Sequence, residues 1–141
     1  MGNKKILVIE DNELNMKLVR GLLSLNSCQY QMLEATDAET GIHMARKHHP
    51  NLILMDIQMP VLNGYEASRA IRLKEKEHSR ERVPIIALTA HAVHGVSEAC
   101  FASGMDDFLT KPLQPSELIG VLQKWLSSGV KIVDDSTSDN T

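Results

Sequence analysis

Three uninterrupted runs of four apolar residues mark the hydropathy pattern of the chain, and each is followed at once by polar residues. They are Ile6–Ile9, Leu52–Met55 and Ile85–Leu88. Short apolar runs of this kind are typical of strands buried on both faces, as in a parallel sheet. Two weaker strands are expected at Gln31–Ala35, nearer an edge, and at Asp107–Thr110. The pattern therefore predicts five strands.

The segments between the strands carry the signals of helices. Asn12 is placed to cap a first helix through its side-chain oxygen. The apolar face expected for this helix carries Leu14, Leu18 and Leu22, with Val19 beside them. Thr36 has Glu39 three residues further on, which is the spacing of a capping box and predicts a second helix.

Three more helices are predicted further along the chain. One starts near Asn63-Gly64, one spans Val96–Ser103 before Gly104, and one has Pro115 in its first turn. The charged stretch Lys74–Arg82 has mixed signs and is predicted to be a solvated helix end and loop. Alternating strands and helices with right-handed crossovers give an α/β fold, a doubly wound parallel sheet with helices on both faces.

Length and composition favour one globular domain of 141 residues, with residues 1–127 folded and residues 128–141 a polar, frayed tail. The net charge of −3 and the lack of a basic cluster argue against a nucleic-acid partner. No apolar run approaches the roughly 20 residues of a membrane helix, so no membrane association is expected. Cys28 and Cys100 have no metal or redox spacing and are predicted to be free thiols in a reducing cytosol.

Polar and charged residues stand where the strands end. Glu10 and Asp11 follow the first strand, Asp56 ends the third, Thr89 ends the fourth and Lys111 follows the last. In a parallel sheet these ends share one edge, where open α/β sheets bind ligands. Each residue alone has an ordinary explanation in a loop or a cap, but four strands ending in this way predict one common site.

The residue types at this edge suit phosphoryl transfer. Clustered carboxylates need a compensating charge, and oxygen ligands favour a hard cation, Mg²⁺ or in its place Mn²⁺. Asp56 is then placed to act as a nucleophile, with Lys111 and Thr89 free to hold a tetrahedral anion. The chemistry predicted is formation of an aspartyl-phosphate on Asp56.

These motifs resemble the receiver domains of two-component response regulators, over roughly residues 4–126. The matching motifs are Glu10-Asp11, Met55-Asp56-Ile57-Gln58-Met59-Pro60, Asn63-Gly64, Thr89-Ala90 and Lys111-Pro112. The resemblance implies a flavodoxin-like sheet of strand order 2-1-3-4-5 with five helices. It also implies that Asp11, Asp56 and the backbone carbonyl of Gln58 hold Mg²⁺, with Glu10 acting through water.

The resemblance further implies a role in a bacterial, cytoplasmic two-component phosphorelay. A histidine kinase or a histidine-phosphotransfer protein would donate the phosphoryl group to a monomer or weak dimer, and a downstream protein would read the result. Thr89 and Phe108 would form the switch that changes the face made by the fourth helix, last strand and last helix. Ala90 would leave room for the phosphoryl group, and the Lys111–Pro112 peptide would be cis. The resemblance also implies that Gln58 and His91, which flank the acceptor, influence the rate of dephosphorylation.

Two other classes of protein have a similar sheet but different residues at its edge. A phosphatase would place a second Asp two residues after the nucleophile, where this chain has Gln58. A flavin-binding protein would need a phosphate loop after the first strand, where Glu10-Asp11-Asn12 would repel the phosphate. We therefore expect an acceptor with at most self-phosphorylation and self-dephosphorylation, not an enzyme. Whether it is a stand-alone receiver or belongs to a hybrid sensor kinase stays open.

Overall fold

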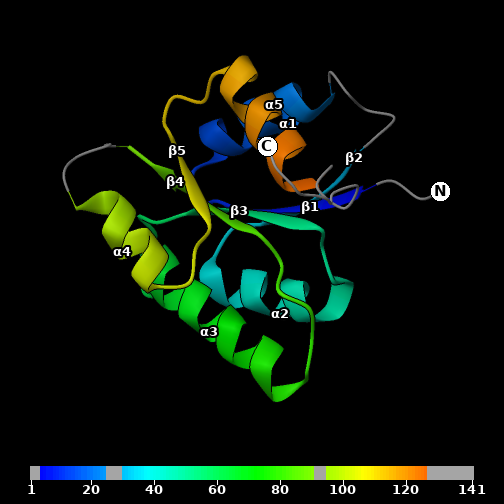
Figure 1. Ribbon diagram of the computed structural model, residues 1–141. Helices are drawn as coiled ribbons and strands as arrows, with labels where there is room; N and C mark the ends of the chain where they lie inside the picture. The colour runs from blue at the N-terminus through cyan, green and yellow to red at the C-terminus, as the bar shows by residue number, and fades with distance from the viewer. Residues whose placement is uncertain (1–3, 25–29, 91–94, 127–141) are drawn as a thin grey trace, which may run out of the picture.

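A five-stranded parallel sheet forms the centre of the protein, with strand order β2-β1-β3-β4-β5 and helices on both faces (Figure 1). The computed structural model describes residues 4–24, 30–90 and 95–126. The strands are β1 (Lys4–Ile9), β2 (Tyr30–Ala35), β3 (Leu52–Asp56), β4 (Ile85–Thr89) and β5 (Asp107–Thr110). The helices are α1 (Glu13–Ser24), α2 (Ala38–His48), α3 (Gly64–Glu77), α4 (Val96–Ala102) and α5 (Pro115–Leu126).

The sheet separates two hydrophobic cores. Helices α1 and α5 cover one face, and α2, α3 and α4 cover the other (Figure 1). Alternate residues of a strand point to opposite faces, so Leu54 of β3 packs in the first core and Met55 in the second. All five residues of β3 are buried, which explains its continuous apolar run. The edge position of β2 confirms the expectation for that strand.

The first helix buries only part of the face predicted for it, since Val19 is buried and Leu22 packs against the core, but Leu14 and Leu18 do not. Asn12 does cap it, accepting a hydrogen bond from the Asn15 backbone N–H at 3.0 Å. The buried residues of α1 are Met16, Val19 and Leu23. By contrast, Leu14 is 76% and Leu18 39% exposed. Apolar residues cover more than one stripe of this helix, so periodicity alone allowed two solutions.

The cap of the second helix is also one residue later than predicted. The N-cap is Asp37, not Thr36, and its Oδ1 accepts a hydrogen bond from the Thr40 backbone N–H at 2.8 Å. A carboxylate at this position also interacts favourably with the positive end of the helix. The hydrogen bonds from Thr40 hold the pKa of Asp37 below its usual range. The predicted helix exists, but the capping box does not.

A partly buried ionic network ties α3 to the starts of β4 and β5. Arg72 donates to Asp106 Oδ2 at 2.8 Å and to Glu75 Oε1 at 2.9 Å. Asp106 also accepts from the Ile85 backbone N–H at 2.9 Å, and Glu75 accepts from the Val83 backbone N–H at 2.9 Å. The side chains of Arg72, Glu75 and Asp106 are only 14%, 13% and 11% exposed. Glu75 lies within the stretch predicted to be solvated, so that prediction is wrong for this residue.

Asn63 and Glu66 form a capping box that begins α3, where the sequence predicted a helix. The next residue, Gly64, packs against the end of β3. A Cβ atom at Gly64 would lie 2.5 Å from the Asp56 carbonyl oxygen and 2.6 Å from the Ile57 Cα. Both neighbours are backbone atoms and cannot move aside cheaply. Glycine is therefore required at this position to bring α3 close to Asp56.

We expect Gly64→Ala to lower the free energy of unfolding by roughly 2 kcal/mol, because the added methyl group overlaps the backbone of β3. Urea denaturation measures the change. Gly120→Ala in α5 is the matched control, because a Cβ there meets nothing within 4 Å. That control should gain about 0.5–1 kcal/mol from the helix preference of alanine. Equal changes in the two variants would contradict the packing role of Gly64.

Candidate functional site

The carboxyl ends of four adjacent strands bring the predicted residues to one edge of the sheet. Asp56 ends β3, which lies between β1 and β4, and Thr89 ends β4 beside β5. The Lys111 ammonium lies 3.1 Å from Glu10 Oε1 and 3.1 Å from Asp56 Oδ1. The Lys111 backbone N–H donates to the Thr89 carbonyl at 2.7 Å. The structure therefore brings together residues far apart in the chain, such as Glu10 and Lys111.

Three carboxylates gather around this lysine. Glu10, Asp11 and Asp56 each offer an oxygen within 4.8 Å of the others. Glu10 and Asp56 are buried, and Asp11 is exposed. One oxygen of Glu10, Oε2, accepts a hydrogen bond from the Asn12 backbone N–H at 3.1 Å. The other, Oε1, is buried and contacts the Lys111 ammonium, but receives no hydrogen bond from the part of the chain that the structure describes.

The backbone fixes Asp56. The Gln58 N–H donates to Asp56 Oδ1 at 3.0 Å, and Lys111 contacts the same oxygen. Burial raises the pKa of Asp56, and the neighbouring Glu10 raises it further, while the Gln58 N–H and Lys111 oppose the rise. Burial and the nearby Asp56 likewise raise the pKa of Asp11. The cluster thus holds more negative charge than Lys111 compensates.

This donor set fits a hard divalent cation. All three side chains offer oxygen atoms, which Mg²⁺ prefers, and the buried Oε1 of Glu10 has only the shared Lys111 ammonium beside it as a donor among the described residues. A cation would also relieve the repulsion that raises the pKa values of Asp11 and Asp56. The structure therefore supports a metal site here on chemical grounds.

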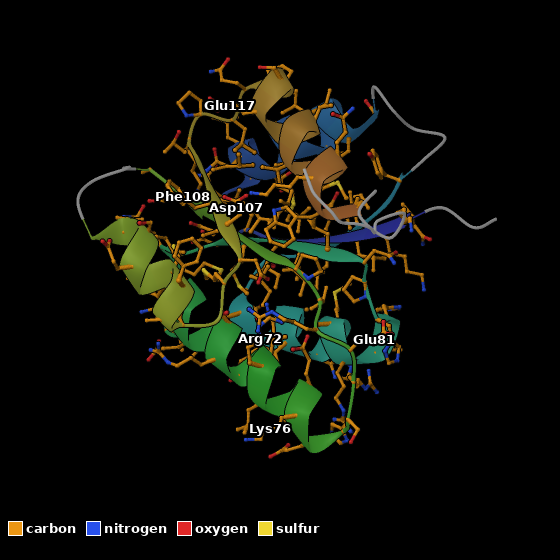
Figure 2. All side chains as sticks on the ribbon, in the orientation of Figure 1. Arg72, Lys76, Glu81, Asp107, Phe108 and Glu117 are labelled. Carbon is orange, nitrogen blue, oxygen red and sulfur yellow. The ribbon has the colours of Figure 1, made fainter. Side chains whose placement is uncertain are left out.

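The other predicted site residues belong to the described part of the chain, with one exception. The side chains of Gln58 and Ala90 are exposed, and Phe108 is half-buried on β5 and packs against the core that α2, α3 and α4 cover (Figure 2). The peptide bond before Pro112 is cis, as expected. His91 lies outside the described residues.

Two contacts at the site were not predicted from the sequence. The Asn12 backbone N–H orients Glu10, although Asn12 was expected only as a helix cap. Gly64 lets α3 approach the backbone of Asp56, although it was expected only as a helix start. The sequence signals were present, since a cap directly follows the acidic pair and a glycine follows Asn63. Their contacts depend on backbone geometry that residue types do not encode.

We expect Asp56→Asn to raise the free energy of unfolding by about 1 kcal/mol at pH 7 in metal-free buffer, because it removes a crowded buried charge. The folded protein holds the Asp56 proton to higher pH than the unfolded chain does, since the pKa is raised from 3.8. The stability contributed by this proton is therefore complete below pH 3.8 and is lost as the pH rises through the folded-state pKa.

Urea denaturation between pH 3.5 and pH 7 measures this difference, which should shrink at the acidic end. Asp37→Asn is the control with the opposite sign, because the pKa of Asp37 is lowered and its charge stabilises the fold. The control should show no gain at pH 7. An Asp56→Asn variant no more stable than the unsubstituted chain would contradict the charge-crowding account.

Comparisons with known proteins agree with this geometry. The chain is 37% identical over 123 residues to the polar-differentiation response regulator DivK of Brucella abortus, covering 87% of this chain and 96% of that protein. It is 36% identical over 126 residues to hybrid signal transduction histidine kinase L of Dictyostelium discoideum, covering 89% of this chain. The chain spans only 7% of the length of that kinase.

Solved structures show the same fold. The receiver domain of sensor histidine kinase PA1611 from Pseudomonas aeruginosa, with a magnesium ion in its active site cleft, matches with a TM-score of 0.77 and 39% identity, covering 90% of this chain and 100% of that one. The receiver domain of Saccharomyces cerevisiae Ssk1, crystallised with the histidine phosphotransfer protein Ypd1, matches with a TM-score of 0.85 and 29% identity. That match covers 95% of this chain and 96% of the other. The family model for the response regulator receiver domain matches residues 6–123, and the chain therefore belongs to this family.

Proposed function

We propose that this chain accepts a phosphoryl group on Asp56 from a phosphohistidine and so acts as a relay in a bacterial two-component system. The observation that carries the proposal is the Lys111 ammonium held 3.1 Å from both Glu10 and Asp56. A cation in this position can contact a phosphoryl oxygen as soon as Asp56 is modified. Family membership adds the class of reaction, since the chain is a receiver domain.

The reacting atom in this proposal is Asp56 Oδ2, because Lys111 and the Gln58 N–H both contact Oδ1. Oδ2 forms a bond to phosphorus as the phosphorus–nitrogen bond of the donor breaks. The electron pair of that bond remains on the imidazole nitrogen. Lys111 and the Thr89 hydroxyl stabilise the charge on the transferred phosphoryl oxygens.

Asp11, Asp56 and the Gln58 carbonyl would hold Mg²⁺, or Mn²⁺ in its place, with Glu10 acting through water. The metal supplies positive charge beside the phosphoryl oxygens. The neighbouring structure of the PA1611 receiver, which contains magnesium in its cleft, supports this assignment. So does the gathering of three carboxylate oxygens within 4.8 Å.

The switch would start at Thr89 and end at Phe108. Thr89 is buried at the end of β4, and Ala90 beside it is small enough to leave space for the phosphoryl group. Movement of Thr89 toward the phosphoryl group would open space for the half-buried Phe108 ring. The face formed by α4, β5 and α5 would then change for a downstream protein. Gln58 and His91 would influence the rate at which water hydrolyses the aspartyl-phosphate. The chain itself would catalyse no further turnover beyond this self-dephosphorylation.

The exposed leucines of α1 would receive the phosphodonor. Leu14 and Leu18 are one helical turn apart, and Leu14 lies three residues after Asp11. An apolar surface beside the acceptor suits a helix of a histidine kinase or histidine-phosphotransfer protein. The Ssk1 receiver was crystallised with a partner of this kind. We expect residues 1–127 to function as the receiver domain, in the cytoplasm and as a monomer or weak dimer; residues 128–141 lie outside the described part.

Incubation with acetyl phosphate and Mg²⁺ should give a single phosphoryl adduct in intact-mass spectrometry. The adduct should be absent from Asp56→Asn and absent when the metal is chelated. Asp107→Asn is the matched control, because Asp107 begins β5 at the far edge of the sheet, and it should react normally. An adduct that persists in Asp56→Asn would exclude Asp56 as the acceptor. Rapid continuous release of phosphate would favour a phosphatase instead.

Replacement of both Leu14 and Leu18 by Ala should slow transfer from a phosphorylated histidine-phosphotransfer protein roughly tenfold, because docking loses apolar contacts. The rate with acetyl phosphate should not change, since that donor needs no docking surface. Leu73→Ala is the control, because Leu73 is 56% exposed on α3, across the sheet from α1. Equal slowing with both donors would show that the α1 substitutions damage the site itself.

A further inference from the structure

A groove of about 640 Å³ lies at the edge of the sheet opposite Asp56. Its lining runs from Lys4, at the start of β1, to Pro84, just before β4, and includes the last two residues of α5. The loop after α3 forms one wall and meets the end of α2, where Arg80 Nη1 donates to the Arg46 carbonyl at 2.8 Å (Figure 1). The groove is therefore separate from the phosphoacceptor site by the length of the strands.

The groove combines an apolar interior with a basic rim. Ile42, Ile71, Val83 and Trp125 are among its apolar lining residues. The basic lining residues are Lys4, Arg46, Lys74, Arg80 and Arg82. Two acidic residues also line it: Glu75 is neutralised by Arg72, and Glu81 is exposed near the end of α2 (Figure 2). The lining is therefore net positive, although the whole chain carries a net charge of −3.

The remainder of the chain has the complementary pattern. It begins at Ser127, directly after Trp125 and Leu126, which both line the groove. Ser127-Ser128-Gly129 can turn the chain, and the apolar segment Val130–Val133 contains a single lysine. Asp134 and Asp135 follow at once. We propose that the C-terminal tail, residues 127–141, docks in this groove of its own chain, with Val130, Ile132 and Val133 on the apolar interior and Asp134-Asp135 at the basic rim.

The tail is long enough to reach. Lys4 and Pro84 belong to β1 and to the start of β4, which are two strand spacings apart, or about 10 Å. Seven extended residues, from Ser127 to Val133, span up to about 23 Å. Because the tail is tethered at the groove, even weak contacts act at a high effective concentration.

The ends of the helices set the conditions for this docking. α2 and α3 end at this edge of the sheet, and the aligned peptide groups of their last turns make it locally negative. Arg46 and Lys74, in the last turns of α2 and α3, offset those ends. Apolar contacts therefore supply most of the binding, and the rim charges set the direction in which the tail lies.

The tail also lies outside the region shared with the family. The family model ends at residue 123, and the match to DivK covers 96% of that protein but only 87% of this chain. Docking in the groove would thus be a property of this chain and does not depend on the phosphoryl chemistry proposed for Asp56.

Trp125 is the one tryptophan of the chain and reports on the groove directly. Acrylamide, a neutral quencher, should reach it poorly in the full-length protein. Replacing both Ile132 and Val133 by Asp should raise the quenching constant roughly twofold, as the half-buried indole loses the cover of the tail. These substitutions lie outside the described residues, and circular dichroism checks that the fold is unchanged.

The rim is tested by Arg46→Glu, which should also raise quenching, but by less than the tail substitutions do, because the rim charges orient the tail and do not supply most of its binding. Lys47→Glu is the matched control, because Lys47 is the exposed neighbour in the same helical turn and does not line the groove. It should leave quenching unchanged. Adding Asp134→Arg and Asp135→Arg to Arg46→Glu should restore protection. Equal quenching of the unsubstituted chain and the tail variant would overturn the proposal, and protection that disappears on dilution would instead assign the groove to the tail of a second copy.

Discussion

The attraction between one ammonium group and two buried carboxylates organises the functional edge of this protein. Lys111 directly follows β5, and its ammonium nitrogen lies 3.1 Å from Glu10 Oε1 and from Asp56 Oδ1. This contact offsets part of the repulsion among three acidic side chains, two of them shielded from water. The strand order makes this contact possible, because it places β1, β3, β4 and β5 side by side so that their carboxyl ends meet. The other groups of the site are arranged around it.

Lys111 compensates only part of the negative charge of the three carboxylates. The pKa values of Asp11 and Asp56 remain raised despite the nearby lysine. A fold that tolerates this crowding gives up some stability to hold Asp56 and its oxygen neighbours in place. A divalent cation or a phosphoryl group bound by Lys111 would each change the charge balance, so the site responds to both.

The strands and the functional cluster were readable from the sequence because each depends on a local pattern. Leu52–Met55 followed by Asp56 shows both a doubly buried strand and its polar end. The α1 face was not readable, because Leu14 and Met16 lie on competing apolar stripes and only packing against the sheet selects one. The pair of Arg72 and Asp106 was not readable either, because 34 residues separate the partners and each looks like an ordinary surface charge. Thr36 was wrongly predicted to be the N-cap of α2, because the neighbouring Asp37 caps that helix with its carboxylate.

The clamp around Asp106 has a mechanical consequence. Arg72, Arg82 and the Ile85 N–H all bind this carboxylate, which holds the starts of β4 and β5 together and against α3. The opposite ends of these two strands carry Thr89 and Lys111, and there Lys111 contacts Glu10 and Asp56. The clamp at Asp106 therefore holds the starts of both strands through groups that are not part of the acidic cluster. A change of charge at Asp56 would act on the Lys111 contact beyond the other end of β5 and would leave this clamp in place.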